Sequence, residues 1–373
     1  MKILFAVCGE GLGHASRSAK LAAYLELHGH SCSFASYGKA YDFIQRQGNF
    51  PVFAISREVT LGGNNGLFSL AKTLWLSKTV LFSLLHSCCD IRRILRENSF
   101  DILVADTMYA AGFAAKSLGI PGVFITNQNT FAPAANPTAV YWQILNRIVQ
   151  HYLQTVPEAV LVPDFPPPDT VSIYNFTISA AEMKHYHFVG PILDRDLSDI
   201  STVSETIFTS FGGESFKLPI YTMLRDIADT MPDRQFEVFS TTPGLPKSTE
   251  NFQTFGYVPD ILPYLAKARA AVLHGGLTTL QEALFYGKPI VMIIDPYHPE
   301  QWNNARKIEE MQAGILIRGD LMTKELLEDA IYSALQMHPP DMKQRFSSEN
   351  GREQICLVLE KIGEKENCNV SRK

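Results

Sequence analysis

A His-Gly-Gly turn followed by two threonines gathers groups that can hold an anion within a few residues of the chain. The turn, His274-Gly275-Gly276, ends an apolar run that predicts a buried strand. Two glycines let the backbone approach a ligand, and the N–H groups at the start of the next helix attract negative charge. Thr278 and Thr279 add hydroxyl donors there, and His274 can donate to a phosphate oxygen. We therefore expect a diphosphate at this turn.

Glu282 extends this pattern by one helical turn. It lies on the same face of the predicted helix as Thr278, where a carboxylate can accept both hydroxyl groups of a ribose. A capped helix after an ordinary strand is the alternative, and an isolated H-G-G sequence would favour it. The pattern continues, however, with Gly287-Lys288-Pro289 and Glu300-Gln301 in order. The combination favours a nucleotide site.

With these residues in order, the chain resembles the GT-B glycosyltransferases that use nucleotide sugars. The similarity is to the inverting branch with plant and bacterial UDP-glycosyltransferases and the lipid-linked N-acetylglucosamine transferases of wall synthesis. The residues that match the pattern of that branch are His274, Gly276, Thr278-Thr279, Glu282, Gly287, Pro289, Pro296 and Glu300-Gln301. The chain departs from the plant enzymes at Thr278, where they usually have Asn, so the identity of the sugar cannot be carried over.

The resemblance also implies which part of the donor each residue would bind. The diphosphate would be held by His274, Gly275, Gly276, Thr278 and Thr279, and from a second Gly-rich loop by Ser210, Gly212 and Gly213. The ribose would be held by Glu282, the donor sugar by Glu300 and Gln301, and the base by Tyr257 and Val258. Asp260 stands where the plant enzymes usually have Gln.

The N-terminal sequence GEGLGHASRS contains the predicted general base, His14. In the enzymes that the chain resembles, this loop faces the interdomain cleft, and histidine can take a proton from an acceptor hydroxyl near neutral pH. Asp106 ends the apolar run FDILVAD at the carboxyl edge of a parallel sheet, where such folds bind their ligands. In the enzymes that the chain resembles, an Asp at this strand end orients the His, so the resemblance implies that Asp106 orients His14. The alternative for Asp106 is a helix N-cap, and the alternative for His14 is that it only caps the helix or contacts the donor or acceptor.

Further residues near these strand ends are assigned to the acceptor side of the cleft. They are Gly13, Arg17, Asn127 and Gln128. Arg17 could neutralise a charged acceptor or the leaving diphosphate, and Asn129 could contact a sugar together with its two neighbours.

The order of the predicted elements indicates two α/β domains. The chain has 373 residues, too many for one ordinary domain, and strands alternate with helices in two similar units. The fold class expected from the resemblance is GT-B, with two Rossmann-like, doubly wound parallel-sheet domains that face a central cleft. We expect an acceptor-binding domain over 1–195, a donor-binding domain over 196–345, and a helix and polar tail over 346–373 that can cross back. One predicted helix begins near Ala15, and a largely helical stretch runs over 66–97.

The segment 67–89 is strongly apolar and includes Trp75, Lys72 and Lys78. Its lysines disfavour a membrane-spanning helix. Either it forms a pair of core helices, or part of it lies exposed beside the acceptor cleft and contacts anionic lipid headgroups. In the superfamily that the chain resembles, members that use lipids have such an apolar surface. The second alternative would place a cytoplasmic protein at the inner face of the membrane.

Composition restricts the possible partners. A net charge of −5 gives no basic surface, so nucleic acid is not expected to bind. The 6 cysteines include no C-x-x-C pair and are too few for a disulfide framework in a chain of 373 residues, so we expect reduced thiols and a cytoplasmic protein. His185 and His187 alternate on a strand-like stretch without a third ligand at a suitable spacing, so we expect no metal there.

Together, the residues and the resemblance predict an inverting, metal-independent glycosyltransferase. It would move a hexose or N-acetylhexosamine from a UDP-sugar to a hydroxyl of a small molecule or lipid, with no cofactor beyond this co-substrate. The protein would be a monomer or a homodimer. One alternative is a nucleotide-sugar 2-epimerase of the same fold, which turns over the donor without an acceptor. The other is a non-catalytic donor-binding subunit of a glycosyltransferase complex.

Overall fold

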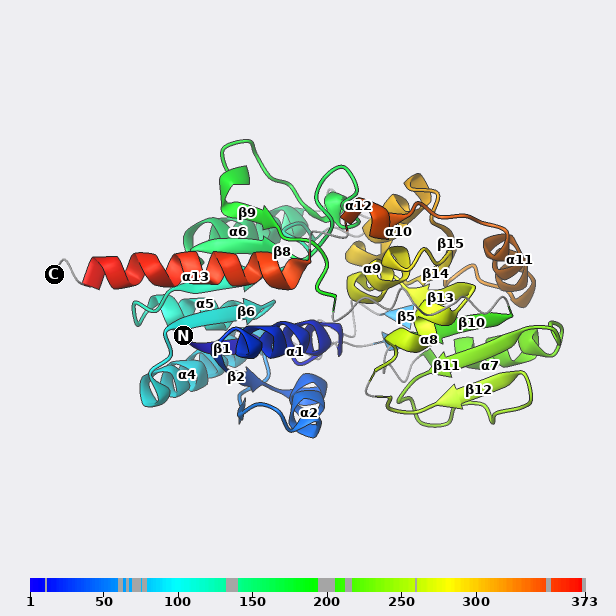
Figure 1. Ribbon diagram of the computed structural model, residues 1–373, viewed down its shortest axis with the longest axis horizontal. Coiled ribbons are helices and arrows are strands. Elements are labelled where there is room, and N and C mark those ends of the chain that lie inside the picture. The colour runs from blue at the N-terminus through cyan, green and yellow to red at the C-terminus, as the bar shows by residue number, and fades with distance from the viewer. Residues whose placement is uncertain are drawn as a thin grey trace.

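Two parallel β-sheets, each covered by helices on both faces, form the two halves of the chain (Figure 1). The computed structural model describes residues 1–10, 12–59, 63–64, 67–68, 75, 79–131, 140–193, 205–211, 217–258, 260–346 and 350–370. Gly212 and Gly213, which we predicted to approach the phosphates, lie outside these ranges.

Within the described residues, the first sheet has seven parallel strands in the order β3-β2-β1-β6-β7-β8-β9. They are β1 (Lys2–Val7), β2 (Ser31–Ser36), β3 (Val52–Ala54), β6 (Ile102–Asp106), β7 (Gly122–Ile125), β8 (Ala159–Val162) and β9 (Tyr186–Phe188). Side chains of β1 alternate between two cores, with Phe5 in one and Leu4 in the other. The apolar run at the N-terminus is therefore buried on both faces, as its composition predicts.

Two layers of helices cover this sheet. The layer on the Phe5 side contains α1 (Leu12–Leu27), α2 (Gly38–Gln47) and α13 (Gly351–Val370). The layer on the Leu4 side contains α4 (Val80–Asn98), α5 (Tyr109–Lys116) and α6 (Val140–Thr155). Two 3-10 helices, η1 (Ile173–Asn175) and η2 (Met183–His185), lie in the connection between β8 and β9.

The second sheet repeats this design. Its strands, in the order β12-β11-β10-β13-β14-β15 among the described residues, are all parallel. They are β10 (Thr206–Ser210), β11 (Gln235–Phe239), β12 (Phe252–Phe255), β13 (Ala270–His274), β14 (Ile290–Ile294) and β15 (Gly314–Arg318). One face carries α7 (Leu218–Ala228) and α11 (Lys324–Leu335). The other carries α8 (Leu262–Lys267), α9 (Leu277–Phe285), α10 (Pro299–Glu310) and α12 (Met342–Phe346).

Each sheet reverses its strand order at one central point, between β1 and β6 in the first and between β10 and β13 in the second. Ligands of open α/β sheets bind beside the carboxyl ends of the strands at such a point. The helix α1 begins beside the first point and α9 beside the second, so their starts define the position of a site. This arrangement confirms the predicted pair of doubly wound parallel sheets.

The C-terminal helix α13 belongs spatially to the first domain (Figure 1). Its buried residues Ile355, Cys356 and Leu359 join the core that contains Ile3 and Phe5. The chain therefore ends on the domain where it began, after passing through the second.

Two details of the predicted elements were wrong. The first helix begins at Leu12 rather than near Ala15, so His14 lies in its first turn and not in the preceding loop. The stretch 66–97 does not start as a helix, because β4 (Gly63–Asn64) and β5 (Leu67–Phe68) pair as an antiparallel hairpin. The helix α4 begins only at Val80, and much of the stretch between lies outside the described residues. In the part of the chain that the structure describes, no helix combines the length and apolar character needed to cross a membrane.

Candidate active site between the two domains

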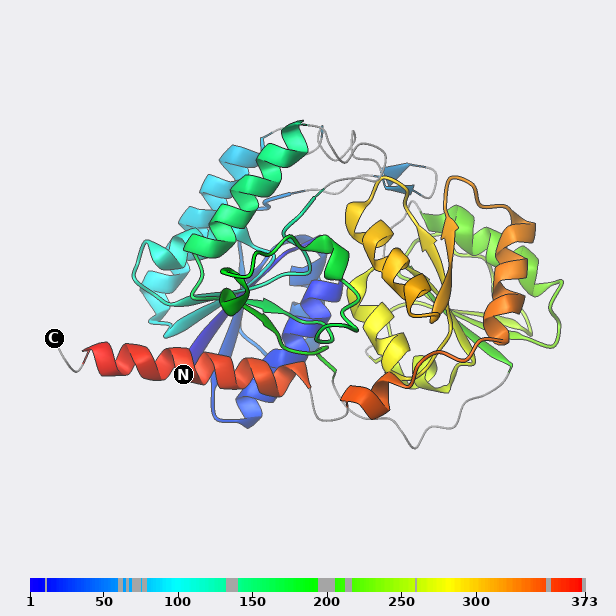
Figure 2. The same ribbon diagram turned by 90° about the horizontal axis from the view of Figure 1, so that it is seen from above.

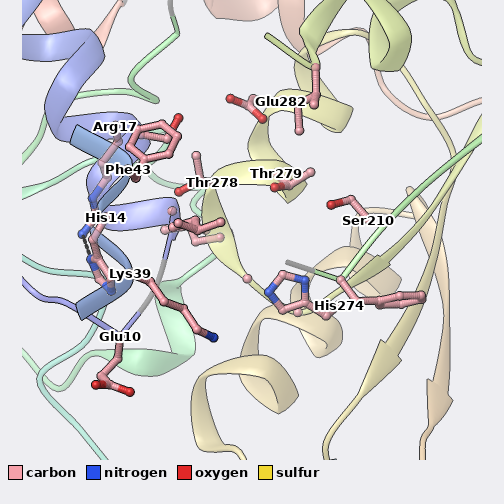
Figure 3. A pocket seen from close by; sticks show the side chains of 18 of the residues that line it. Glu10, His14, Arg17, Lys39, Phe43, Ser210, His274, Thr278, Thr279 and Glu282 are labelled. Carbon is pink, nitrogen blue, oxygen red and sulfur yellow. Dashed lines mark hydrogen bonds between the residues drawn. The ribbon is translucent and has the colours of Figure 1, made fainter. Parts of the chain in front are cut away.

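A cavity of about 530 Å³ lies between the two domains, with α1 on one side and α9 on the other (Figure 3). Most of the predicted site residues line it: Gly13, His14, Arg17, Asn127, Gln128, Ser210, Tyr257, Val258, His274, Gly275, Gly276, Thr278, Thr279, Glu282, Glu300 and Gln301. Asp106 lies behind His14. The side-chain amide of Asn129 instead donates to the Thr177 carbonyl and the Tyr186 hydroxyl, at 3.0 and 3.1 Å.

His14, Arg17 and Asp106 form a cluster in the first domain. The Nδ1 atom of His14 lies 2.8 Å from Oδ1 of Asp106. Arg17 donates to the same carboxylate through two nitrogens, with Nε 2.7 Å from Oδ2 and a terminal nitrogen 2.5 Å from Oδ1. Ser18 donates to Oδ2 at 2.9 Å. These contacts, rather than the start of α5, use the acceptor capacity of Asp106.

Asp106 is buried, yet it is held in its charged form. Burial alone would raise the pKa of this carboxyl, but the charges of Arg17 and His14 and their hydrogen bonds outweigh it and hold the pKa well below its usual range. An ionised carboxylate can only accept, so its contact with His14 requires the proton on Nδ1. A terminal nitrogen of Arg17 also lies 3.0 Å from Nδ1. With the proton on Nδ1 of His14, the free lone pair of the ring lies on Nε2.

The start of α9 forms the opposite wall. Its N-cap residue is Gly276, which makes no side-chain capping bond, and Thr278 and Thr279 line the cavity within the first helical turn. The backbone N–H groups of this turn and the two hydroxyls therefore suit an anion. Any side chain at Gly276 would meet the His274 ring, since a Cβ there would lie 2.6 Å from Nε2. The turn thus needs glycine for a steric reason.

His274 is neutral at physiological pH. Burial lowers its pKa to about 4, and the nearby charge of Lys217 acts in the same direction. Its Nδ1 atom is buried and has no hydrogen-bond partner among the described residues. The neutral ring can offer one N–H donor to a phosphate oxygen, without adding a positive charge.

Two predicted donor residues form polar contacts with the first domain. Nζ of Lys20 on α1 lies 2.6 Å from Oε1 of Glu282 on α9. The side-chain amide of Asn127 donates to Oε1 of Glu300 at 3.2 Å. The residues expected to bind the ribose and the sugar therefore also contact the domain on the other side of the cleft.

Gln301 is used differently from the other predicted residues. Its side-chain oxygen accepts from the backbone N–H of Asp295 at 2.8 Å, and its nitrogen lies 3.2 Å from the Asp295 carboxylate. Asp295 in turn forms a buried ion pair with Lys217 at 2.6 Å. The amide of Gln301 therefore fixes Asp295 at the edge of the cavity.

On the base side of the cavity, Tyr257 and Val258 follow β12. The Tyr257 ring is half-exposed and meets the edge of Phe43 from α2, with ring centroids 6.2 Å apart. An exposed aromatic face at this place can support a flat base.

Sequence reasoning missed Lys20, Phe43, Asp295 and Lys217, all of which line the cavity. Asp295 follows the buried strand β14 directly, so the strand-end signal that identified Asp106 would have found it too. Lys20 lies on a helix face with no special spacing, and nothing local marks it.

Comparison with known proteins agrees with this architecture. Residues 1–334 match Glycosyl transferase family 1. An uncharacterized glycosyltransferase of Methanosarcina acetivorans is 28% identical over 383 aligned positions, which cover 98% of this chain and 100% of the relative.

Solved structures agree as well. The glycotransferase of kitacinnamycin has a TM-score of 0.68 at 18% identity, covering 96% of this chain and 98% of its own. A spinosyn rhamnosyltransferase complexed with thymidine diphosphate has a TM-score of 0.64 at 17% identity, covering 90% and 92%. At these identities the likeness shows the GT-B fold. The chain is thus a glycosyltransferase that belongs to Glycosyl transferase family 1.

Proposed function

We propose that this glycosyltransferase moves a hexose or N-acetylhexosamine from a UDP-sugar to an acceptor hydroxyl, with inversion at the anomeric carbon. The donor diphosphate would lie at the start of α9, and the acceptor would enter from the side of α1. The observation that carries the proposal is the His14–Asp106 pair, 2.8 Å apart, across the cavity from the phosphate-type turn at His274.

The residues divide the chemical work. Nε2 of His14 takes the proton of the acceptor hydroxyl, while Asp106 holds Nδ1–H and stabilises the imidazolium that forms. The acceptor oxygen bonds to the anomeric carbon on the face opposite the diphosphate, and the bond from that carbon to the diphosphate oxygen breaks. Negative charge grows on the leaving group, where Thr278, Thr279 and the first turn of α9 donate to it.

We propose that this charge needs no metal ion and no other cofactor. The first turn of α9 supplies N–H donors and the positive end of a helix dipole, and the neutral His274 adds a further donor. In the described chain, the one cluster of His, Cys, Asp and Glu side chains spaced for a metal lies at His30, Cys356 and Glu360, outside the residues that line the cavity. Activity that survives a strong chelator would support this part of the proposal.

The test of the proposed base compares His14→Ala with His28→Ala, an exposed histidine just beyond the end of the same helix. UDP-sugars that raise the melting temperature are first identified, since a ligand that binds the native state stabilises it. We expect His14→Ala to lower kcat by about 100- to 10,000-fold with donor binding retained, and His28→Ala to have no effect. Full transfer by His14→Ala would refute the base assignment, and turnover of donor without acceptor would indicate an epimerase.

We also propose that the acceptor is a lipid, approached through a surface on the first domain. Apolar side chains are exposed on two helices of one layer: Leu81, Phe82 and Leu85 on α4, and Tyr141, Ile144, Leu145 and Ile148 on α6. The exposure of Leu81, Phe82 and Leu85 is not what the alternative of a core helix pair for 67–89 predicts. Lys72 and Lys78, expected to face anionic headgroups, lie outside the described residues. Helices that lead into parallel strands start at the carboxyl edge of the sheet, and both groups of side chains lie mainly in the first halves of α4 and α6 (Figure 2), so they belong to the ends of these helices nearest that edge.

The charge of this surface favours an anionic bilayer as its partner. Residues 79–89 and 140–155 contain no acidic residue, and Arg147 adds a positive charge on α6. Apolar side chains flanked by basic groups are typical of interfacial helices. We expect binding to vesicles with anionic lipid and weaker binding to neutral ones, reduced by the pair Phe82→Ser and Ile144→Ser. Dimerisation through the same side chains, with no vesicle binding, would assign the surface to a second copy instead.

A further inference from the structure

The first domain reaches every part of the predicted donor site. Three of its residues contact a donor-site residue: Lys20 with Glu282, Phe43 with Tyr257, and Asn127 with Glu300. A fourth, Gly13, lies so near Thr278 that an added Cβ would be 3.3 Å from its Oγ1. These four partners are the residues predicted for the diphosphate, the ribose, the base and the sugar. The donor site is therefore shared between two domains, although every predicted donor-binding residue belongs to the second.

We infer that Lys20 is a positioning residue that completes the ribose site from the first domain. It would hold Glu282 in place so that a nucleoside diphosphate is bound tightly only when the two domains are closed. This inference rests on the proposed donor, because it takes Glu282 as the ribose ligand.

The geometry of the pair supports positioning. The two side chains are 16% and 5% exposed, and Nζ lies 2.6 Å from Oε1, so the carboxylate is fixed by a short, shielded contact. A carboxylate has about four acceptor positions on its two oxygens, so one ammonium leaves room for two ribose hydroxyls. Lys20 does not need to leave for the ribose to bind.

The charge of the pair supports the same role. Glu282 lies one helical turn from Thr278, where the diphosphate is expected, and two negative groups so close would repel each other. The ammonium of Lys20 cancels the charge of Glu282 while leaving its oxygens as acceptors. Without Lys20, a shielded carboxylate would face the phosphates uncompensated, so donor affinity should fall.

A competing role would give the opposite sign. If Lys20 instead blocked Glu282 in the empty enzyme, removing it would strengthen nucleotide binding. Lys20→Met keeps most of the side-chain length without the charge, so it separates the two roles. A matched control is Lys267→Met, which breaks a Lys–Glu pair of 2.7 Å with Glu237, at residues that do not line the cavity.

The experiment measures the binding of the ribonucleotides UDP, CDP, GDP and ADP by calorimetry and continues with the tightest ligand. We expect Lys20→Met to weaken its binding about tenfold, Lys20→Arg to keep most of it, and Lys267→Met to match the wild type. The wild type should bind the 2′,3′-dideoxy form of that nucleotide about tenfold more weakly than the nucleotide itself. For Lys20→Met, this loss of affinity should be much smaller. In turnover, the donor KM should rise with little change in kcat.

The outcomes separate this inference from the proposed function. If the wild type binds one of the nucleotides, but Lys20→Met binds it equally or more tightly, the positioning role is wrong and the donor site stands. An equal dideoxy penalty in both proteins would likewise refute the coupling of Lys20 to the ribose. If the wild type binds another of the four nucleotides but not UDP, the proposed UDP donor is wrong and Lys20 is tested with the nucleotide that binds. If it binds none of the four, the proposed donor and this inference both fail.

Discussion

Asp106 determines the tautomer of the predicted base. It is fully buried, and its two oxygens accept from His14, Arg17 and Ser18. Burying a carboxylate is costly unless it is paired, and the buried Arg17 offsets that cost. The same arrangement keeps Asp106 ionised, so that the Nε2 lone pair of His14 remains available to an acceptor hydroxyl.

Asp106→Asn should therefore lower kcat by about 100- to 10,000-fold while the affinity for UDP changes little, because the proposed UDP contacts lie mainly on the opposite wall. The amide also leaves Arg17 without a negative partner, so the free energy of unfolding should fall by about 3–5 kcal/mol. Steady-state kinetics and urea denaturation measure the two effects. An unchanged kcat in folded protein would show that Asp106 serves stability alone.

Glu58 gives a pH dependence at the same scale. Burial raises its pKa to about 7, against the hydrogen bonds from Ser87 and from two backbone N–H groups at the start of α5. A raised folded pKa means that the protonated form stabilises the fold. This stability is complete below about pH 4.5 and is lost as the pH rises through 7.

Glu58→Gln should increase the free energy of unfolding by about 1–3 kcal/mol at pH 8, and the gain should vanish below about pH 4.5. Denaturation curves at several pH values measure it. Glu97→Gln, at an exposed position on α4, is the control and should show no such trend. Equal pH profiles for both variants would contradict the prediction.

Among the elements, α13 ties the end of the chain to the first sheet. Leu359 is fully buried in the core that contains Phe5, whereas Leu357 on the same helix is 59% exposed. The helix thus contributes to the stability of a domain from which it is separated by the whole second domain.

Leu359→Ala should lower the free energy of unfolding by about 2–5 kcal/mol, because it removes buried methyl groups and leaves a cavity. Leu357→Ala should change it by less than about 0.5 kcal/mol. Chemical denaturation of both variants tests the difference. Similar values would mean that α13 does not pack on the sheet in solution.

At the scale of the whole molecule, the domains meet on two sides. Away from the cleft residues, Gln281 of α9 donates to Asp164 at 2.8 Å, and Asn175 donates to Asn304 at 2.9 Å. We call these two hydrogen bonds the second contact region. At the cleft the contacts are to the predicted donor residues, including the close approach of Gly13 to Thr278. A substitution at the cleft can therefore alter domain closure without changing the hydrogen bonds of the second contact region.

A side chain at Gly13 should hold the cleft open. A Cβ there would lie 3.3 Å from Oγ1 of Thr278, so Gly13→Val should weaken UDP binding about tenfold with little loss of stability. Thr278→Ala removes the atom nearest to that Cβ. In the Thr278→Ala background, Gly13→Val should therefore reduce the affinity for UDP much less. Calorimetry on the four proteins of this cycle tests the contact, and additive losses would show that it is not steric.

The sequence by itself determined the two sheets and the residues at their central strand ends. Apolar runs, glycine turns and helix starts follow from short-range backbone chemistry, so the strands around Asp106 and His274 and the nucleotide-type turn could be predicted locally. The GT-B fold and the family, which the resemblance to known enzymes implied, are confirmed. The roles assigned to single site residues remain predictions.

Tertiary structure decided the rest. Apolar composition cannot tell a core helix from an exposed one, so the exposure of Leu81 and Phe82 became visible only once α4 was packed. Lys20 and Glu282 are 262 positions apart, and their contact depends on how the two domains face each other. Periodicity reports on residues a few positions apart, whereas a site shared by two domains arises from packing that no local pattern encodes.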